Sequence, residues 1–338
     1  MPGFLVDFDN LGDTAMILRG IDFGHVFCAA GARNFIGEGY WHSRFTDWTG
    51  STLVTKTTTI DPRAGNMPLK SGSTQPRDFL PDCIRVKPLL GIALNAVGLS
   101  GPGARALFED GRWQGLAKPF LISFMPVAPT KEGRLDETRR FVDLVQVYRS
   151  GFTSRFGIEF NGTCPNLKNV DFMEVVSEAQ EELGILAALG VPVSIKLNLL
   201  VTPATAAEIA AHCDALCITN AIPFGKLAGK IDWVRYFGTD DPAQSPLAKY
   251  GGGALSGPPL LPLVHNWVYE FRNLESNSFP INAGGGVFSI RDAMLLLGAG
   301  ATSVFLGTVG MLRPWRVQGI IQAVNHFCEA RDRREQST

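Results

Sequence analysis

The sequence lacks the features that mark several classes of protein. Its 338 residues contain no uninterrupted apolar run long enough to span a bilayer, and its first residues lack the basic and apolar segments of a signal peptide. Six cysteines are scattered along the chain without a CxxC pair or a zinc-type spacing with histidine. Two of them, Cys213 and Cys217, border a buried strand and are best explained by packing. The five histidines show no HExxH or similar ligand spacing. We therefore expect a reduced, cytoplasmic protein without a metal site.

An excess of charge of one sign is also missing. The 31 lysines and arginines are balanced by 32 acidic residues, so no net field favours nucleic acid or an anionic membrane. The 22 phenylalanines form no repeated pattern with basic residues of the kind that binds single-stranded RNA. A small molecule is the expected partner.

What the chain does contain is a sizeable apolar fraction and a repeating order of strands and helices. With 45% hydrophobic residues and 37 glycines, it has the composition of a globular protein with many tight turns. We predict a single domain over 1–338, with a barrel core over about 25–312 and a C-terminal helix over 313–331. The expected strands are 25–31, 51–57, 119–125, 156–162, 192–198, 215–220, 279–284 and 302–307, and the expected helices are 134–150, 170–189, 203–213, 261–274, 289–298 and 314–331.

Eight parallel strands suit a closed (β/α)8 TIM barrel. An open doubly wound sheet is the alternative, but no GxGxxG follows the first strand. Two stretches, 58–118 and 221–258, interrupt the alternation and are longer than ordinary connections. Both follow the carboxyl ends of strands, where barrels carry their catalytic residues, so we interpret them as functional insertions at that face.

The last two strands run into glycine. The segments INAGGGVFSIRDA and VFLGTVG each lead from a strand through glycine towards a helix. Glycine allows backbone N–H groups to approach an anion, and barrels often bind phosphate after strands seven and eight. The alternative is that Gly284, Gly285, Gly286 and Gly307 only form tight turns.

The fourth strand leads into EFNGTCPN at 159–166. Cys164 at the catalytic face is typical of a base or nucleophile, and Asn161 and Asn166 offer donors and acceptors for a polar ring. Alternatively, Cys164 is a small buried residue and both asparagines form turns. The spacing alone favours the second explanation.

Two lysines end apolar strands at the same face. Lys56 and Lys196 could stabilise an anionic cofactor or substrate, or they could be solvated or ion-paired. By themselves, Asn95 and Asn220 have the pattern of ordinary loop asparagines.

Taken together and in this order, these segments resemble the dihydroorotate dehydrogenase family, in its soluble class that uses cysteine. The resemblance covers roughly residues 25–312. It rests on AAG at 29–31, TKTTTIDPRAGNMP at 55–68, LNAVGL at 94–99, EFNGTCPN at 159–166, SIKLN at 194–198, ITN at 218–220, AGGGVFSIRDA at 283–293 and FLGT at 305–308.

The resemblance implies an FMN site and a pyrimidine site. The implied mechanism is removal of a C5 proton by Cys164, with Lys56 as a second catalytic residue, while hydride passes from C6 to flavin N5. The cofactor would contact Ala30, Gly31, Lys56, Thr57, Asn95, Asn161, Lys196 and Gly257, with its phosphate on Gly285, Gly286, Gly307 and Thr308. The substrate would contact Lys56, Asn95, Asn161, Asn166 and Asn220, with its carboxylate facing the backbone of Val97, Gly98 and Leu99.

The sequence departs from the family pattern in the substrate loop. The usual NSMGLPN is NAVGLSG at 95–101, and the serine that often follows the asparagine of strand six is Ala221. In addition, YGGGALSG at 250–257 is similar to the FMN domain of dihydropyrimidine dehydrogenase. Dihydrouracil or dihydrothymine is therefore an alternative substrate to dihydroorotate.

The partners and the reaction class also remain open at this point. The resemblance implies a soluble acceptor such as fumarate, or an NAD-linked partner subunit, and a homodimer. A Schiff-base lyase or aldolase would instead use Lys56 or Lys196 on a phosphorylated carbonyl compound. A flavin-dependent RNA dihydrouridine synthase is a third reaction class, which the balanced charge disfavours.

Overall fold

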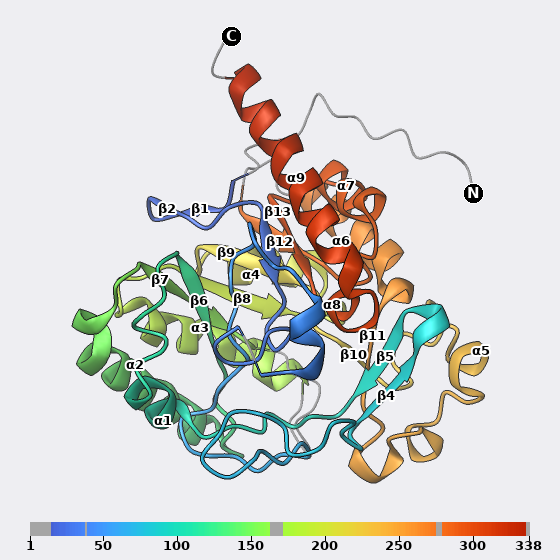
Figure 1. Cartoon of the computed structure of the whole chain (residues 1–338), viewed down its shortest axis with the longest axis horizontal. Coiled ribbons are helices and arrows are strands. Elements are labelled where there is room, and N and C mark those ends of the chain that lie inside the picture. The colour runs from blue at the N-terminus through green and yellow to red at the C-terminus, as the bar shows by residue number, and fades with distance from the viewer. Residues whose placement is uncertain (1–14, 38, 163–171, 275–278, 336–338) are drawn as a thin grey trace.

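The computed structural model describes residues 15–37, 39–162, 172–274 and 279–335. Its central element is a curled parallel sheet of seven strands (Figure 1). In order across the sheet, these are β3 (Val26–Cys28), β13 (Ser303–Leu306), β12 (Ile281–Ala283), β9 (Ala215–Ile218), β8 (Val193–Leu197), β7 (Phe156–Phe160) and β6 (Phe120–Phe124).

Residues 52–58 close the gap between the two edges of this sheet. The Thr52 N–H donates to the Val26 carbonyl of β3 at 2.8 Å. On the other side, the Leu53 carbonyl accepts from Leu121 of β6 at 2.9 Å. The segment thus takes the place of the second predicted strand, although it forms isolated bridges instead of a continuous strand. The prediction of a TIM barrel is confirmed, and the open doubly wound alternative was wrong.

Alternating side chains along each strand separate the interior of the barrel from its outer layer, as the two-residue period of a strand requires. The interior is small and contains both apolar and polar side chains. The apolar ones lie towards the amino ends of the strands, and the polar ones lie near the carboxyl ends. The apolar interior cluster includes Phe27, Val54, Leu121, Ala215, Cys217 and Phe305. The intervening positions, such as Val26, Ile122, Ile158, Ile195, Leu216 and Val304, belong to the larger cluster beneath the helices.

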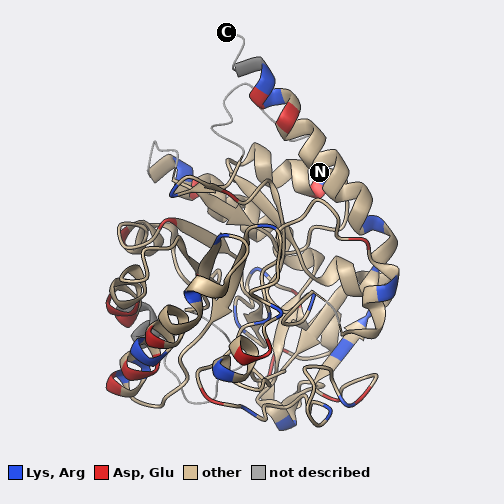
Figure 2. Ribbon diagram, turned by 60° about the vertical axis from the view of Figure 1, so that its left-hand side comes forward, with Lys and Arg blue, Asp and Glu red and all other residues tan. Residues whose placement is uncertain are grey.

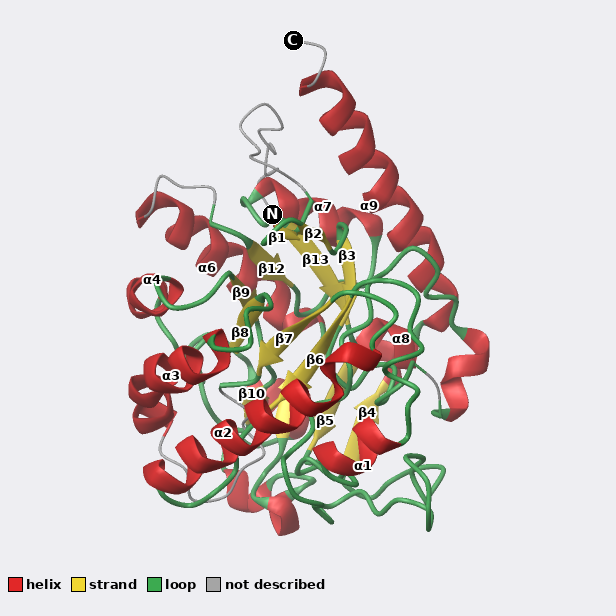
Figure 3. Cartoon of the chain, turned by 90° about the vertical axis from the view of Figure 1, so that its left-hand side faces the viewer, coloured by secondary structure: helices red, strands yellow, loops and turns green. Residues whose placement is uncertain are grey.

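Helices cover the outside of the sheet (Figure 3). Threonine or serine side chains cap several of them, as at Thr130, Thr202 and Ser289. In the described residues, no helix combines the length and the apolar character needed to cross a membrane. The six predicted helices are confirmed as α2 (Lys131–Tyr148), α3 (Phe172–Ala187), α4 (Pro203–Ala210), α6 (Leu261–Leu274), α7 (Ile290–Gly298) and α9 (Pro314–Glu335).

A short hairpin closes the end of the barrel opposite the catalytic face. It consists of β1 (Ile17–Leu18) and β2 (Ile21–Asp22), which pair antiparallel. Leu18 of β1 and Phe23, which directly follows β2, pack into the interior cluster. A Cβ at Gly157 of β7 would lie 3.4 Å from the Phe23 ring and 2.8 Å from Leu121, so glycine leaves room for this closure.

The two long insertions pair with each other. They form a second, antiparallel sheet in the order β10 (Ile222–Pro223), β11 (Ala254–Ser256), β5 (Ile92–Asn95) and β4 (Ile84–Lys87). Asn95 lies opposite Ala254, so segments about 160 residues apart meet beside the barrel mouth. The sequence analysis did not predict these strands, because pairing between distant segments leaves no local periodic signal.

Short helices complete the insertions and the last βα unit. They are α1 (Ala104–Glu109), α5 (Trp233–Phe237) and α8 (Thr308–Leu312), with 3-10 turns at Trp41–Phe45, Pro88–Leu90, Arg149–Gly151, Pro242–Gln244, Ala248–Tyr250 and Pro258–Leu260. In the view of Figure 2, ribbon positions of lysine and arginine are interspersed with those of aspartate and glutamate. This mixture agrees with the balanced composition.

Candidate functional site

A cavity of about 1060 Å³ lies at the carboxyl ends of the barrel strands. Strand ends form its floor, and the second sheet and the 39–44 and 75–81 segments contribute to its walls. Most of the residues proposed for the site from the sequence line this one cavity: Ala30, Gly31, Lys56, Thr57, Asn95, Val97, Leu99, Asn161, Lys196, Asn220, Gly257, Gly285, Gly286, Gly307 and Thr308.

One predicted site residue lies outside the cavity lining, and two fall outside the described residues. Gly98 lies between two lining residues but does not itself line the cavity. Cys164 and Asn166 lie outside the described residues, in the segment that follows β7. Their roles stay predictions from the sequence.

Close contact between two glycine turns forms one wall. Gly286 has a φ of 85°, and a Cβ there would lie 2.8 Å from the Gly257 carbonyl oxygen. Gly257 has a φ of 123°, and its Cβ would lie 2.4 Å from the Gly91 oxygen. Only glycine allows this backbone conformation together with this approach. The GGG segment (284–286) and the LSG segment (255–257) therefore contact each other and together form one wall of the cavity.

Backbone donors point to an anion at this wall. Among the described residues, no acceptor is found for the N–H groups of Gly285, Gly286, Gly307 and Thr308. All four residues line the cavity. Since backbone N–H groups without a partner are rare in folded proteins, a bound oxyanion is a suitable acceptor.

Lys56 contributes a buried, ionisable amino group to the lining of the same cavity. The residue is 6% exposed, its Nζ donates to the Ser100 carbonyl, and Nζ lies 4.5 Å from the centre of the Phe35 ring. Burial lowers the pKa of the Lys56 ammonium to about 7. An anion next to Lys56 would favour its charged form.

A chain of polar side chains crosses the floor of the cavity. The Asn220 Nδ2 donates to Asn161 Oδ1 at 2.6 Å, and Asn161 Nδ2 donates to Thr57 Oγ1 at 3.0 Å. Thr57 Oγ1 lies 2.8 Å from Ser123 Oγ, and Ser123 Oγ donates to Glu159 Oε1 at 3.2 Å. These hydrogen bonds join the 52–58 segment, β6, β7 and the residues after β9, although β8 separates β7 from β9 in the sheet.

The second strand-end lysine belongs to the same floor. Lys196 Nζ lies 3.9 Å from Glu159 Oε1 and 5.2 Å from the centre of the Phe305 ring. Both charged side chains are almost fully buried, at 6% and 2% exposed. Of the two alternatives to a ligand role, the solvated side chain is excluded for Lys196, whereas the ion pair is present at the cavity.

The loop after β5 exposes a run of backbone donors. Gly98 and Leu99 have φ values of 70° and 58°, which turn successive N–H groups towards one side. Two side chains bind carbonyl groups of this loop. Asn66 Nδ2 donates to the Ala96 oxygen at 2.7 Å, and Arg63 Nε donates to the Gly98 oxygen at 3.0 Å. In the described part of the chain, no acceptor is found for the N–H groups of Val97, Gly98 and Leu99.

Three residues of the site were not proposed from the sequence. Ser123 and Glu159 continue the hydrogen-bonded chain without lining the cavity, and Arg63 supports the loop after β5. The sequence does contain a signal for Ser123 and Glu159. Each is the lone polar residue of an otherwise apolar strand, at a position that points into the barrel. No local signal marks Arg63, whose partner is 35 residues away.

Two cysteines that the sequence assigns to packing lie away from the cavity. Cys217 is 2% exposed inside the barrel, and burial raises the pKa of its thiol well above the usual value. Cys213 is half-buried, and burial raises its pKa to about 12. Neither thiol lines the cavity, which agrees with the assignment to packing.

Comparison with known proteins gives a consistent family. The family model described as dihydroorotate dehydrogenase matches residues 16–328. The catalytic subunit of dihydroorotate dehydrogenase B (NAD(+)) from Desulforudis audaxviator is 29% identical over 311 residues, covering 89% of this chain and 88% of that protein. The subunit of the same name from Caldicellulosiruptor bescii is 29% identical over 246 residues, covering 70% of this chain and 73% of that protein.

Solved structures agree on the fold. The structure of DHODH from Eimeria tenella in complex with ferulenol has a TM-score of 0.62 to this chain. The identity is 17%, and the match covers 94% of this chain and 85% of that one.

Proposed function

Because the chain belongs to the dihydroorotate dehydrogenase family and is therefore an oxidoreductase acting on a CH–CH bond, we propose that it oxidises dihydroorotate to orotate with bound FMN. The reaction would serve pyrimidine biosynthesis. The observation that carries this proposal is the joint lining of one cavity by the glycine wall, Lys56 and the loop after β5.

The residues of the cavity fit FMN. The unpartnered N–H groups of Gly285, Gly286, Gly307 and Thr308 would hold its phosphate. When bound, FMN supplies the acceptor for a hydride. Its ring would be held by the strand-end residues Ala30, Gly31, Lys56, Thr57, Asn95, Asn161, Lys196 and Gly257.

The loop after β5 supports an acid as substrate. Its N–H groups at Val97, Gly98 and Leu99 suit a carboxylate, which dihydroorotate carries and dihydrouracil and dihydrothymine lack. The departure from the family pattern leaves this backbone in place, because Ser100 anchors it: Ser100 Oγ donates to the Val97 carbonyl at 3.1 Å and accepts from the Met67 N–H at 3.0 Å. Dihydroorotate is thereby favoured over the neutral dihydropyrimidines.

Cys164 is the proposed base for the C5 proton. A thiol has an ordinary pKa of about 8.5 and accepts a proton efficiently only as the thiolate. The protonation state of Cys164 therefore controls removal of the C5 proton. The asparagines Asn95, Asn161, Asn166 and Asn220 would hold the pyrimidine ring. The buried Lys56 would stabilise negative charge on the ligands.

The names of the relatives support an NAD-linked electron acceptor. Dihydroorotate dehydrogenase B (NAD(+)) is named as a catalytic subunit in these organisms, so we propose a partner subunit that passes electrons to NAD. Fumarate is the alternative acceptor. The homodimer and the cytoplasmic location expected from the sequence stay predictions.

Anaerobic flavin bleaching tests the proposed substrate. The FMN-loaded protein is mixed separately with dihydroorotate, dihydrouracil and dihydrothymine, and the absorbance of oxidised flavin is followed. We expect dihydroorotate to bleach it and the two neutral compounds to fail. Reoxidation by fumarate, by quinone, or by NAD with the partner subunit then identifies the acceptor.

Two results would contradict the proposal. Bleaching by dihydrouracil or dihydrothymine but not by dihydroorotate would assign the chain to the alternative substrate class. Purification without flavin, together with failure to bind added FMN, would remove the redox proposal. The lyase and RNA dihydrouridine synthase alternatives receive no support from the family match.

A further inference from the structure

Glu159 occupies an unusual place for a carboxylate. It lies at the fourth residue of β7, on the face of the strand that points into the barrel, and is 1% exposed. Burial of an acid is costly unless hydrogen bonds and an opposite charge compensate it. Glu159 has both, in Ser123 and Lys196. The carboxylate itself does not line the cavity, so any effect on a ligand passes through its neighbours.

The hydrogen bonds around Glu159 share one direction. The Asn161 amide N–H donates to Thr57 Oγ1, so the single proton of the Thr57 hydroxyl is available for Ser123. The Ser123 hydroxyl in turn donates to Glu159. Every donor in this chain therefore points towards the carboxylate, which as an anion can only accept.

This direction fixes how two asparagines face the cavity. Because Asn161 Nδ2 is directed to Thr57, its Oδ1 is directed to Asn220 and accepts from Asn220 Nδ2 at 2.6 Å. Each amide then keeps one N–H for a ligand, and Asn220 keeps its side-chain oxygen as an acceptor. A pyrimidinedione edge presents carbonyl, N–H and carbonyl in sequence, and this set of groups complements it.

We infer that Glu159 is a positioning residue: acting through Ser123 and Thr57, it sets the orientation of the Asn161 and Asn220 amides and thereby the donor and acceptor pattern offered to the pyrimidine ring. This inference rests on the proposed function. Glu159 also supplies the counter-charge of Lys196 from the same oxygen, Oε1. The orientation of the ring-binding amides and the charge beneath the cofactor site thus depend on one carboxylate.

The test is the affinity of the FMN-loaded protein for orotate, measured by the change in the flavin spectrum. Glu159→Gln keeps the shape but provides an N–H that can donate to Ser123 and reverse the chain. Ser123→Ala interrupts the chain and leaves the Glu159–Lys196 pair in place. We expect both variants to keep their flavin and to bind orotate at least about tenfold more weakly. Glu182→Gln, which changes an equally buried acid away from the cavity, is the control and should bind orotate like the wild type.

A double-mutant cycle separates positioning from a general structural effect. In an Asn220→Ala background, one of the two amides that the chain orients is absent, so Ser123→Ala should cause less further loss of orotate affinity. Equal losses in both backgrounds would contradict the inference, as would wild-type affinity in Ser123→Ala. If Glu159→Gln does not fold, the Ser123→Ala cycle decides alone. Wild-type protein that binds flavin but no orotate would overturn the proposed function and the inference with it.

Discussion

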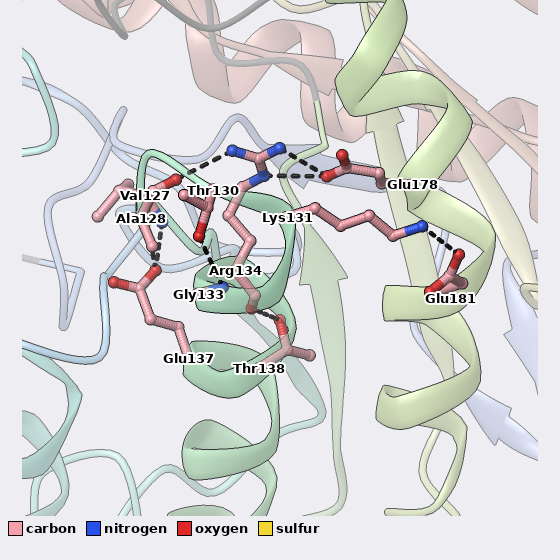
Figure 4. Close-up of polar contacts among 10 residues, drawn as sticks. All are labelled: Val127, Ala128, Thr130, Lys131, Gly133, Arg134, Glu137, Thr138, Glu178 and Glu181. Carbon is pink, nitrogen blue, oxygen red and sulfur yellow. Dashed lines mark hydrogen bonds and ion pairs between the residues drawn. The ribbon is translucent and has the colours of Figure 1, made fainter.

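Arg134 of α2 and Glu178 of α3 form an ion pair that is almost fully buried between the two helices (Figure 4). Arg134 Nε and Nη2 both donate to Glu178 Oε2, at 3.0 and 2.7 Å, and Nη1 donates to the Ala128 carbonyl at 3.0 Å. Each side chain is 5% exposed. The pair thus joins the helices that follow β6 and β7, beside the strands that carry Ser123 and Glu159.

Removing the arginine of this pair should destabilise the protein strongly. Arg134→Met leaves Glu178 buried without its partner, so we expect the free energy of unfolding in urea to fall by about 3–5 kcal/mol. Lys131→Met is the control, because the Lys131–Glu181 pair is 37% and 54% exposed and solvent screens it, so its loss should change stability little. The double variant Arg134→Met with Glu178→Leu should recover much of the loss. A small effect of Arg134→Met alone would contradict this account.

A second buried acid, Glu182, should make stability depend on pH. Burial, and then the neighbouring Glu178, raise the pKa of Glu182 from 4.5 to about 8. Between these values the folded protein holds a proton that the unfolded chain releases, so this group costs increasing stability as the pH rises from 4.5 to 8. Glu182→Gln removes the cost. We expect the variant to gain a few kcal/mol over the wild type at about pH 9 and little at about pH 4.5, measured by urea unfolding at each pH. A gain independent of pH would argue against the raised pKa.

Adding a methyl group to the glycine wall should abolish flavin binding. At Gly286, with its φ of 85°, a Cβ would lie 2.8 Å from the Gly257 oxygen and 2.9 Å from Pro258 Cα. The two turns must then separate, which displaces the N–H groups proposed for the phosphate. We expect Gly286→Ala to purify with less than about a tenth of the wild-type flavin content. Gly184→Ala in α3, where a Cβ would contact nothing within 4 Å, should keep its flavin.

Loosening the loop after β5 should weaken binding of the substrate carboxylate without affecting the cofactor. Arg63→Met removes the donor to the Gly98 carbonyl, so the orientation of the adjacent N–H groups is no longer held. We expect the KM for dihydroorotate to rise by about tenfold at unchanged flavin content. Arg105→Met on α1, whose side chain is 71% exposed, is the matched control. An unchanged KM in Arg63→Met would show that the loop does not depend on this support.

Replacing the proposed base should separate cofactor binding from turnover. Cys164→Ala should keep its flavin. We expect dihydroorotate to reduce this flavin at least about 100-fold more slowly than in the wild type, because no thiolate accepts the C5 proton. In the wild type, the reduction rate should rise with pH towards about 8.5, the ordinary pKa of a thiol. Cys213→Ala, at a thiol that does not line the cavity, should retain activity. Wild-type rates in Cys164→Ala would refute the assignment.

Local patterns predicted the elements of the barrel but not the way it closes. Short β-rich runs such as FLISF and VSIKL mark strands wherever they pair, and β6 and β8 lie where the sequence placed them. Residues 52–58 pair on both sides but only at isolated positions, so their regular-looking sequence gives a strand that is irregular in space. Pairing of β5 with β11 depends on two insertions meeting, which no local window contains.

The candidate site divides in the same way. Strand-end Lys56 and the glycines of GGG were identified from the sequence because their positions follow from their place along the chain. The contact of Gly286 with Gly257, and the hydrogen bonds from Asn220 to Glu159, were not, because they join residues on different strands.

By itself, the sequence determined the order of the barrel strands and of the six long helices and the kinds of chemical group at the strand ends, because these follow from local patterns and the covalent order of the chain. Only the tertiary structure decided the closure of the barrel, the pairing of the two insertions, the run of free N–H groups after β5 and the direction of the hydrogen bonds that end at Glu159. These depend on distances and angles between residues far apart in the chain, which are set when the strands curl together and their side chains compete for the same small interior.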